Sequence, residues 1–497
     1  MKTSFLVRAS TGIVLSSLLS YGALAQESLL DVVSAGDTQS ALEMVTRRTD
    51  VNASQSDGTT ALHWAIYYDD AALVRRLLRR GADVTAKNVY GATPLSQAAI
   101  IGNPDIIEML LDEDADVNEL NADGQTAIMV VARTDNLAAA RVLLDAGADV
   151  NVAEQWRGQT ALMWAAAQKQ PEMIQLLLEH GANPDAQSTP NNWERQVTAE
   201  PRMKILPAGG LTPLLYAARE GCALCVQYLL AGGANPDKVD PEAVSPMLLA
   251  TLNANWDSAK VLLESGANPD KWDIYGRSPL YASIDYNTLP HGGRADRLSS
   301  DLTTSLEMIE LLLEAGANPN LQLKLFPPYR NLGADRGADG LLRTGVTSLF
   351  RAARGGDVPA MKLLLAHGAI VDLPNENDVT PLMAAAGYRA SAIDTRGRFR
   401  NEAQAFAATT LLLETGQAGV NLQEVTGQTA LFGAATQGWN SVVELLVENG
   451  ADLNVVDNNG NTVIDAAMGR AGRFGRGAGG DMHIETAALL EKLISEQ

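Results

Sequence analysis

The stretch "GATPLSQAAIIGNPDIIEMLLDEDADVN" (91–118) contains the plan of one small structural unit. Thr93 is a good helix N-cap, and Pro94 suits the first helical position, where the missing N–H costs nothing. Ala98 and Ala99 are small enough to let a neighbouring helix approach closely. Gly102 then breaks the helix and turns the chain. These residues predict a short first helix followed by a tight turn.

The rest of the stretch predicts a second, amphipathic helix and a connecting finger. Apolar residues recur on one stripe of this helix, at Ile106, Ile107, Leu110 and Leu111. Sister copies end the helix at Gly147, Gly181 and Gly266, where glycine adopts the left-handed C-cap conformation. The chain then passes through a tight turn such as Asp123-Gly124 or Asn459-Gly460, which suits a hairpin tip. One unit is therefore two helices plus a finger.

This unit recurs along the 497-residue chain. A Thr/Ser-x-apolar triplet starts at Thr60, Thr93, Thr126, Thr160, Thr212, Ser245, Ser278, Thr347, Thr380, Thr429 and Thr462. The gaps are 33, 33, 34, 52, 33, 33, 69, 33, 49 and 33 residues. A fixed period with occasional excess is typical of a repeat protein with insertions.

Two further copies, "GLTPLLYAAREGCALCVQYLLAGGANPD" (210–237) and "GQTALFGAATQGWNSVVELLVENGADLN" (427–454), keep the same order of pieces. The T-P-L-x-x-A-A, L-L and G-A-D-x-N pieces resemble the ankyrin repeat, and more narrowly exported bacterial ankyrin proteins with long inserts. The resemblance implies a mainly α solenoid of about twelve repeats, each a helix-turn-helix with a β-hairpin or turn finger. The family's usual histidine after T-P-L survives only as His63, so its hydrogen bond is expected at that position alone.

Excess length locates the predicted domain boundaries. We expect a signal peptide at 1–25, a capping repeat at 26–58, repeats at 59–187, an insert at 188–209, repeats at 210–320 with an insert at about 287–304, an insert at 321–344, repeats at 345–459 with an insert at about 388–403, and a capping repeat at 460–497 that includes a Gly/Arg-rich insert at 469–480. Units of this kind are stable only when stacked on their neighbours, so the terminal repeats should carry a polar outer face.

The N-terminus reads as a secretory signal. Lys2 and Arg8 precede the apolar stretch 11–20, and "ALA" (23–25) offers small residues for cleavage before Gln26. We therefore expect an exported, periplasmic chain, with secretion as the alternative. An apolar first helix of the fold is the other interpretation. No segment is long enough to span a bilayer.

Charge limits the class of partner. Lysine and arginine number 38 against 59 acidic residues, a net charge of −21, which argues against nucleic acid as the main partner. The five predicted inserts differ from the rest because they sum to +8. They either contact an anionic envelope surface or fold back onto the acidic body. The candidate basic contacts are Arg396, Arg398, Arg400, Arg470, Arg473 and Arg476.

Large aromatic and arginine residues gather at finger tips and at the ends of first helices. These types dominate the energetics of protein interfaces, and repeat proteins bind through such variable positions. The alternative is that some of them pack between neighbouring fingers. The candidate protein-binding residues are Tyr67, Tyr68, Tyr90, Trp156, Arg157, Trp272, Tyr275, Arg277 and Tyr286.

The two cysteines of the chain are three residues apart. Alignment of the second helices puts Cys225 in a buried apolar position and Cys222 in the first turn. A local disulfide, two thiols or a redox pair all fit this spacing. A zinc site would need two more ligands, and none is evident.

No catalytic motif, cofactor site or metal site is recognised. His180 and His367 both precede a helix-ending glycine, where a cation suits the helix C-terminus. We expect a non-catalytic scaffold that binds another protein, of unknown identity, through a concave groove. A secreted effector that binds host proteins is one alternative. An enzyme with a site built from the inserts, around Asp394 or Asp481, is the other.

Overall fold

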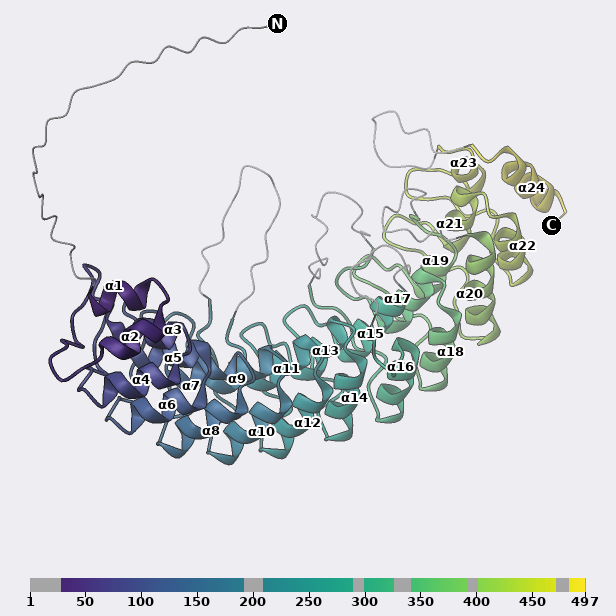
Figure 1. The fold of residues 1–497 in the computed structure, drawn as a ribbon. Helices are drawn as coiled ribbons and strands as arrows, with labels where there is room; N and C mark the ends of the chain where they lie inside the picture. The colour runs from purple at the N-terminus through teal and green to yellow at the C-terminus, as the bar shows by residue number, and fades with distance from the viewer. Residues whose placement is uncertain are drawn as a thin grey trace, which may run out of the picture. The chain divides into compact units, whose positions relative to one another are not determined.

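The computed structural model describes residues 28–191, 209–288, 299–325, 341–390, 401–470 and 482–496 (Figure 1). The chain divides into two compact units, Met1–Ala115 and Asp116–Gln497, called here the N-terminal and C-terminal units. The predicted signal peptide and most of each predicted insert lie outside the described residues. So do Arg396, Arg398, Arg400, Arg473 and Arg476.

The described part of the N-terminal unit is built from three helix pairs. They are α1 (Leu29–Ser34) with α2 (Thr38–Met44), α3 (Ala61–Tyr67) with α4 (Ala71–Leu78), and α5 (Pro94–Ile101) with α6 (Pro104–Leu111). First helices contact first helices and second helices contact second helices, so the pairs stack in two layers. Leu62, Ile66, Leu73 and Leu77 are fully buried between these layers. The stacking agrees with a unit that cannot bury its apolar stripe alone.

The described part of the C-terminal unit repeats this arrangement nine times. Its helices are α7 (Ala127–Ala132), α8 (Leu137–Asp145), α9 (Ala161–Ala167), α10 (Pro171–Glu179), α11 (Pro213–Glu220), α12 (Ala223–Ala231), α13 (Pro246–Leu252), α14 (Trp256–Glu264), α15 (Pro279–Asn287), α16 (Ser305–Glu314), α17 (Ser348–Gly355), α18 (Val358–Ala366), α19 (Pro381–Ala385), α20 (Glu402–Glu414), α21 (Ala430–Gln437), α22 (Asn440–Glu448), α23 (Val463–Ala467) and α24 (Ile484–Ser495). Figure 1 shows the first helices in one row and the second helices in another. With the N-terminal unit, the described residues form 24 helices, or twelve pairs.

The local signals of the repeat act as the sequence predicted. Thr93 caps α5 by accepting the N–H of Ser96 at 3.2 Å, and Pro94 is the first helical residue. Gly102 ends α5 with φ +81°, a left-handed conformation that glycine adopts without strain. Short helices are therefore defined by their ends as well as by their apolar stripe.

The fingers are turns and not β-hairpins. The described residues contain three isolated antiparallel bridges, Ser54–Thr60, Pro190–Gly209 and Val456–Thr462, and no paired strands. The expected hairpin form was therefore wrong, and the turn form holds. The physical reason is that a polar side chain at the start of the turn takes up the backbone N–H groups that a ladder would otherwise use. None of the described helices is long and apolar enough to cross a membrane.

Candidate functional site

The finger tip that carries Trp156 is built on a buried carboxylate. Glu154, which is 5% exposed, accepts backbone N–H groups from Trp156 at 2.6 Å, Arg157 at 2.8 Å and Gln159 at 3.1 Å. Gln159 in turn donates its side-chain N–H to the Tyr216 hydroxyl at 2.7 Å, which ties the tip to helix α11. Trp156 itself is 78% exposed. A large aromatic side chain is thus held in solvent on a fixed backbone.

The tip around Tyr275 uses an aspartate in the same role. Asp273 is completely buried and accepts the N–H groups of Tyr275 at 3.0 Å and Arg277 at 2.9 Å. Its other oxygen accepts the Nε–H of Arg277 at 2.7 Å, and the guanidinium lies 5.1 Å from the centre of the Tyr275 ring. Both residues are half-buried by these contacts. Trp272, next to them in sequence, is exposed.

Neighbouring tips of the C-terminal unit are joined by backbone hydrogen bonds. Ile274 donates to the carbonyl of Glu242 at 3.0 Å, and Lys324 donates to that of Tyr275 at 2.8 Å. Thr189 donates to the carbonyl of Arg157 at 2.6 Å. Bonds of this kind make adjacent tips members of one row, so exposed side chains on them are positioned relative to each other.

Acidic groups accompany the aromatic residues in the middle of this row. Burial raises the pKa of Asp240, and the nearby Asp273 carboxylate adds to this effect. Burial also raises the pKa of Glu242, with Asp240 contributing, and it raises the pKa of Tyr275, to which Glu242 adds. Arg277 offsets part of this negative charge. The row therefore presents aromatic and acidic groups together.

In the N-terminal unit, Asn88 plays the capping role. It accepts the N–H of Tyr90 at 3.1 Å, and Tyr90 is 71% exposed. Tyr67 and Tyr68 form a cluster with Trp64, and the Tyr68 hydroxyl donates to the carbonyl of Ser34 at 3.1 Å. Tyr67 keeps most of its surface in solvent, whereas Tyr68 is partly used in packing.

Two of the predicted contact residues are engaged elsewhere. Tyr286 packs edge-on against Trp256 with ring centres 5.2 Å apart, so part of its ring surface is used within the fold. Arg470 lies 3.5 Å from the carboxylate of Asp465 on α23. Arg470 is the candidate basic contact that the described residues include. Its pairing is of the kind expected if basic segments neutralise the acidic body.

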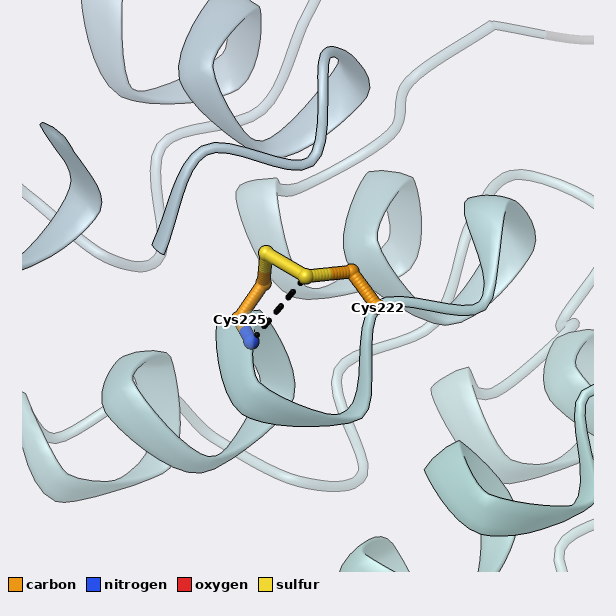
Figure 2. The surroundings of a disulfide bond; sticks show 2 residues. All are labelled: Cys222 and Cys225. Atoms are coloured by element: carbon orange, nitrogen blue, oxygen red, sulfur yellow. Dashed lines mark hydrogen bonds between the residues drawn. A yellow bond between two sulfur atoms is a disulfide. The ribbon is translucent and has the colours of Figure 1, made fainter. Parts of the chain in front are cut away.

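The two cysteines are joined in the structure. Figure 2 shows the disulfide between Cys222 and Cys225 at the start of α12. His180 and His367 sit at C-caps, and each Nδ1 lies 2.9 Å from a backbone carbonyl oxygen of the preceding turn. Within the described ranges, no group of three or more His, Cys, Asp or Glu side chains is placed to hold a metal ion.

Sequence reasoning passed over the aliphatic residues of the tips. Val89, Ile274, Val425 and Val456 are exposed beside the capping residues Asn88, Asp273, Glu424 and Asp457. Aligning the fingers on their capping residue, instead of the helices on Thr-Pro-Leu, would have found them. The exposed surface of the tips is therefore more apolar than the aromatic residues alone suggest.

Comparison with known families identifies the repeat. A family model described as ankyrin repeats (3 copies) matches residues 29–121, 95–188, 198–273, 214–323, 299–394 and 401–474. The chain belongs to the ankyrin repeat family. Ankyrin repeats generally act by binding other proteins and not by catalysis, so the predicted role in protein–protein interaction is supported at this general level.

The relatives of this chain include vertebrate proteins. The chain is 32% identical to the mouse B-cell lymphoma 3 protein homolog over 47% of its own length and 33% of that protein. It is 36% identical to zebrafish ankyrin repeat and SAM domain-containing protein 6 over 25% of its length and 18% of that protein. The solved human ASB11 ankyrin repeat domain matches with a TM-score of 0.40 and 22% identity, over 48% of this chain and 98% of that one.

These matches cover only part of each curated relative. The matched part spans a third or less of the two curated relatives named here. The narrower resemblance to exported bacterial ankyrin proteins stays a prediction, because neither curated relative named here is bacterial.

Proposed function

We propose that this ankyrin repeat chain is a non-catalytic scaffold whose C-terminal unit binds a protein partner on its row of finger tips. The observation that carries the proposal is Trp156, which is 78% exposed although its own N–H is fixed by the buried Glu154. An exposed tryptophan on a mobile loop would lose entropy on binding. One on a fixed tip loses little, and this favours affinity.

The chemistry of the row favours a protein over a small molecule. Trp272 and Ile274 are exposed on the same finger, and Tyr275 beside them is kept in place by Arg277. Aromatic residues surrounded by polar groups form the energetic centres of protein interfaces. Small-molecule sites, in contrast, are concave and enclose most of their ligand.

The direct test begins with affinity purification of the full chain from its native source and mass-spectrometric identification of what co-purifies. The identified protein is then purified and titrated against the full chain by calorimetry. We expect the double variant Trp156→Ala, Trp272→Ala to weaken binding by at least about tenfold, the effect typical of interface anchors. Trp156 is 78% exposed and Trp272 is 47% exposed, so the melting temperature should change little.

The matched control is Leu302→Ala. Leu302 is 92% exposed, precedes α16 and belongs to no finger. The control variant should bind as the unmodified chain does. If the tryptophan double variant binds with unchanged affinity, or if Leu302→Ala weakens binding equally, the finger tips are not the interface.

We also keep export as a proposal. Its support is the charged start, apolar stretch and small-residue site within residues 1–25. Cell fractionation and N-terminal sequencing of the mature chain test it. A periplasmic chain that begins at Gln26 is the expected result, secretion into the medium favours the effector alternative, and an uncleaved cytosolic chain contradicts export. The enzyme alternative around Asp394 or Asp481 concerns residues outside those that the structure describes.

A further inference from the structure

The two cysteines occupy different environments at the start of α12. Cys222 is the N-cap residue and is partly exposed, and its sulfur accepts the backbone N–H of Cys225 at 3.2 Å. Cys225 is the third helical residue and has no exposed surface. Figure 2 shows the sulfur–sulfur bond lying across this first turn. Of the two residues, Cys222 therefore keeps surface in contact with solvent and Cys225 has none.

The N-cap position does not need a disulfide to do its work. In α4, α6, α8 and α18 the N-cap side-chain oxygen accepts the N–H of the third helical residue. The accepting residues are Asp70 at 2.9 Å, Asn103 at 3.4 Å, Asn136 at 3.0 Å and Asp357 at 3.2 Å. In α12 sulfur replaces that oxygen. Reduced Cys222 as a thiolate carries the negative charge that a helix N-terminus stabilises. Reduction therefore leaves the cap in place.

The position of Cys225 does not need the bond either. Sister helices fill it with fully buried residues of different sizes, namely Leu73, Ile106, Ala139, Met173, Ala360 and Val442, and α14 places Ser258 there. A cysteine side chain falls within this range of volumes. The bond spans a separation of three residues, and loops that short gain the least from cross-linking. The repeat therefore accommodates both the bonded and the unbonded pair.

We propose that Cys222 and Cys225 form a reversible thiol–disulfide exchange site whose reactants are small thiols of the glutathione class. A thiolate attacks the sulfur of Cys222 and forms a mixed disulfide. The Cys222–Cys225 bond breaks, and its electron pair goes to the Cys225 sulfur, which takes a proton. A second thiolate attacks the sulfur of the bound thiol. The two small thiols leave together as a disulfide, and Cys222 remains as a thiolate at the N-cap. Two thiols are oxidised and the protein disulfide gains two electrons.

The test uses the full chain under native conditions. The chain is equilibrated in buffers that span a wide range of reduced to oxidised glutathione ratios, quenched with acid and alkylated. Mass spectrometry then counts the modified cysteines. We expect the fraction reduced to rise smoothly and reversibly within this range, with unchanged far-UV circular dichroism and melting temperature. A pair that stays oxidised at every ratio, or is reduced only in denaturant, overturns the proposal. So does reduction that lowers the melting temperature by more than a few degrees.

Single variants test which sulfur is attacked. Serine suits both positions, because it is a good N-cap and because Ser258 is buried at the equivalent place in α14. With oxidised glutathione, Cys225→Ser should form a mixed disulfide at Cys222, whereas Cys222→Ser should leave Cys225 unmodified. Equal modification of both variants contradicts an attack directed to Cys222. The double variant Cys222→Asp, Cys225→Val copies residues of sister helices. It should melt as the reduced chain does, and a clear loss of stability shows that the bond is needed for the fold.

Discussion

The imidazole Nε2 of His63 lies 3.1 Å from the carbonyl oxygen of Ala92, so the first helix of one repeat is tied to the finger of the next. Since a carbonyl only accepts, Nε2 carries the proton and donates it. Nδ1 then accepts from the Thr60 hydroxyl at 2.9 Å. Both ring nitrogens of a buried, neutral histidine are therefore satisfied.

This arrangement predicts an acid-sensitive contribution to stability. Burial lowers the pKa of His63 below its ordinary value of about 6.5. The unfolded chain then binds more protons than the folded one. Stability from this residue is complete above about pH 6.5 and is lost as the pH falls through the folded-state value. The variant His63→Met, which copies Met129 and Met163 of sister helices, should lose this part of the pH dependence. Urea unfolding of the variant and the unmodified chain from pH 7.5 to 5 measures this difference. If stability changes with pH equally in both chains, His63 is not the source of the acid sensitivity.

A second prediction concerns the side chains that link successive units at the ends of the second helices. Asn151 donates to the carbonyl of Gly181 at 3.0 Å and accepts from the N–H of Asn183 at 2.8 Å. Asp237 accepts from the N–H of Asn268 at 2.9 Å, but a carboxylate has no N–H to donate. We expect Asp237→Asn to stabilise the chain by about 0.5–1.5 kcal/mol, the value of one hydrogen bond. Asn151→Asp should destabilise it by a similar amount in the same urea titration. Changes of the same sign in both variants would rule out this explanation.

Two tryptophans are expected to have different roles, Trp256 in stability and Trp156 in binding. Trp256 is 2% exposed and packs against Tyr286, whereas Trp156 is 78% exposed. Trp256→Ala should cost about 3–5 kcal/mol, because it removes a large buried side chain and leaves a cavity. Trp156→Ala should change stability by less than about 0.5 kcal/mol. Denaturant unfolding of both variants measures the difference. A large cost for Trp156→Ala would mean that its ring contributes to the fold, which would weaken its assignment to an interface.

The repeat itself could be predicted because its signals are local. Thr93, Pro94 and Gly102 act through backbone groups within a few residues of themselves, so each recurrence of the pattern specifies the same helix ends. The finger conformation could not be predicted in this way. Asp-Gly and Asn-Gly pairs favour hairpins, but Asn121 takes up the N–H groups of the Asp123-Gly124 tip, and Asp457 does the same at the Asn459-Gly460 tip, so no continuous ladder forms.

The candidate site was predicted less completely, since burial depends on residues far apart in the sequence. Tyr286 carries no local sign that Trp256 covers part of its ring. The hydrogen bond from Gln159 to Tyr216 joins positions 57 residues apart, across the insert at 188–209. Conversely, the different burial of Cys222 and Cys225 followed from aligning the second helices, because the position of Cys225 is fully buried in sister helices such as α4, α6 and α10.

The buried phenol of Tyr388 predicts that the chain loses stability at high pH. Burial, together with the nearby Glu424 carboxylate, raises the pKa of Tyr388 to about 12. Between about pH 10, the ordinary value, and this value the folded chain holds a proton that the unfolded chain has lost. Stability should therefore fall as the pH rises through this window. Tyr388→Phe removes the phenol and should flatten that fall, whereas Tyr90→Phe, at an exposed tip, should not. Urea unfolding midpoints of the unmodified chain and the two variants, measured from pH 9 to 12, test this prediction. Parallel curves for all three would show that Tyr388 does not cause the fall in stability.

Replacing the buried Arg354 is expected to lower the stability of the chain strongly. Its guanidinium is almost completely covered and donates to the carbonyl of Tyr388 at 2.6 Å and to that of Arg389 at 3.0 Å, just where helix α19 gives way to a loop. Arg354→Met should cost about 2–4 kcal/mol, because it leaves carbonyl groups without donors in a buried place. Arg343 is the matched control: it pairs with Glu376 at 3.3 Å, and both side chains are exposed. Arg343→Met should cost less than about 1 kcal/mol. If the two variants unfold at the same urea concentration, the Arg354 contacts do not hold the end of α19.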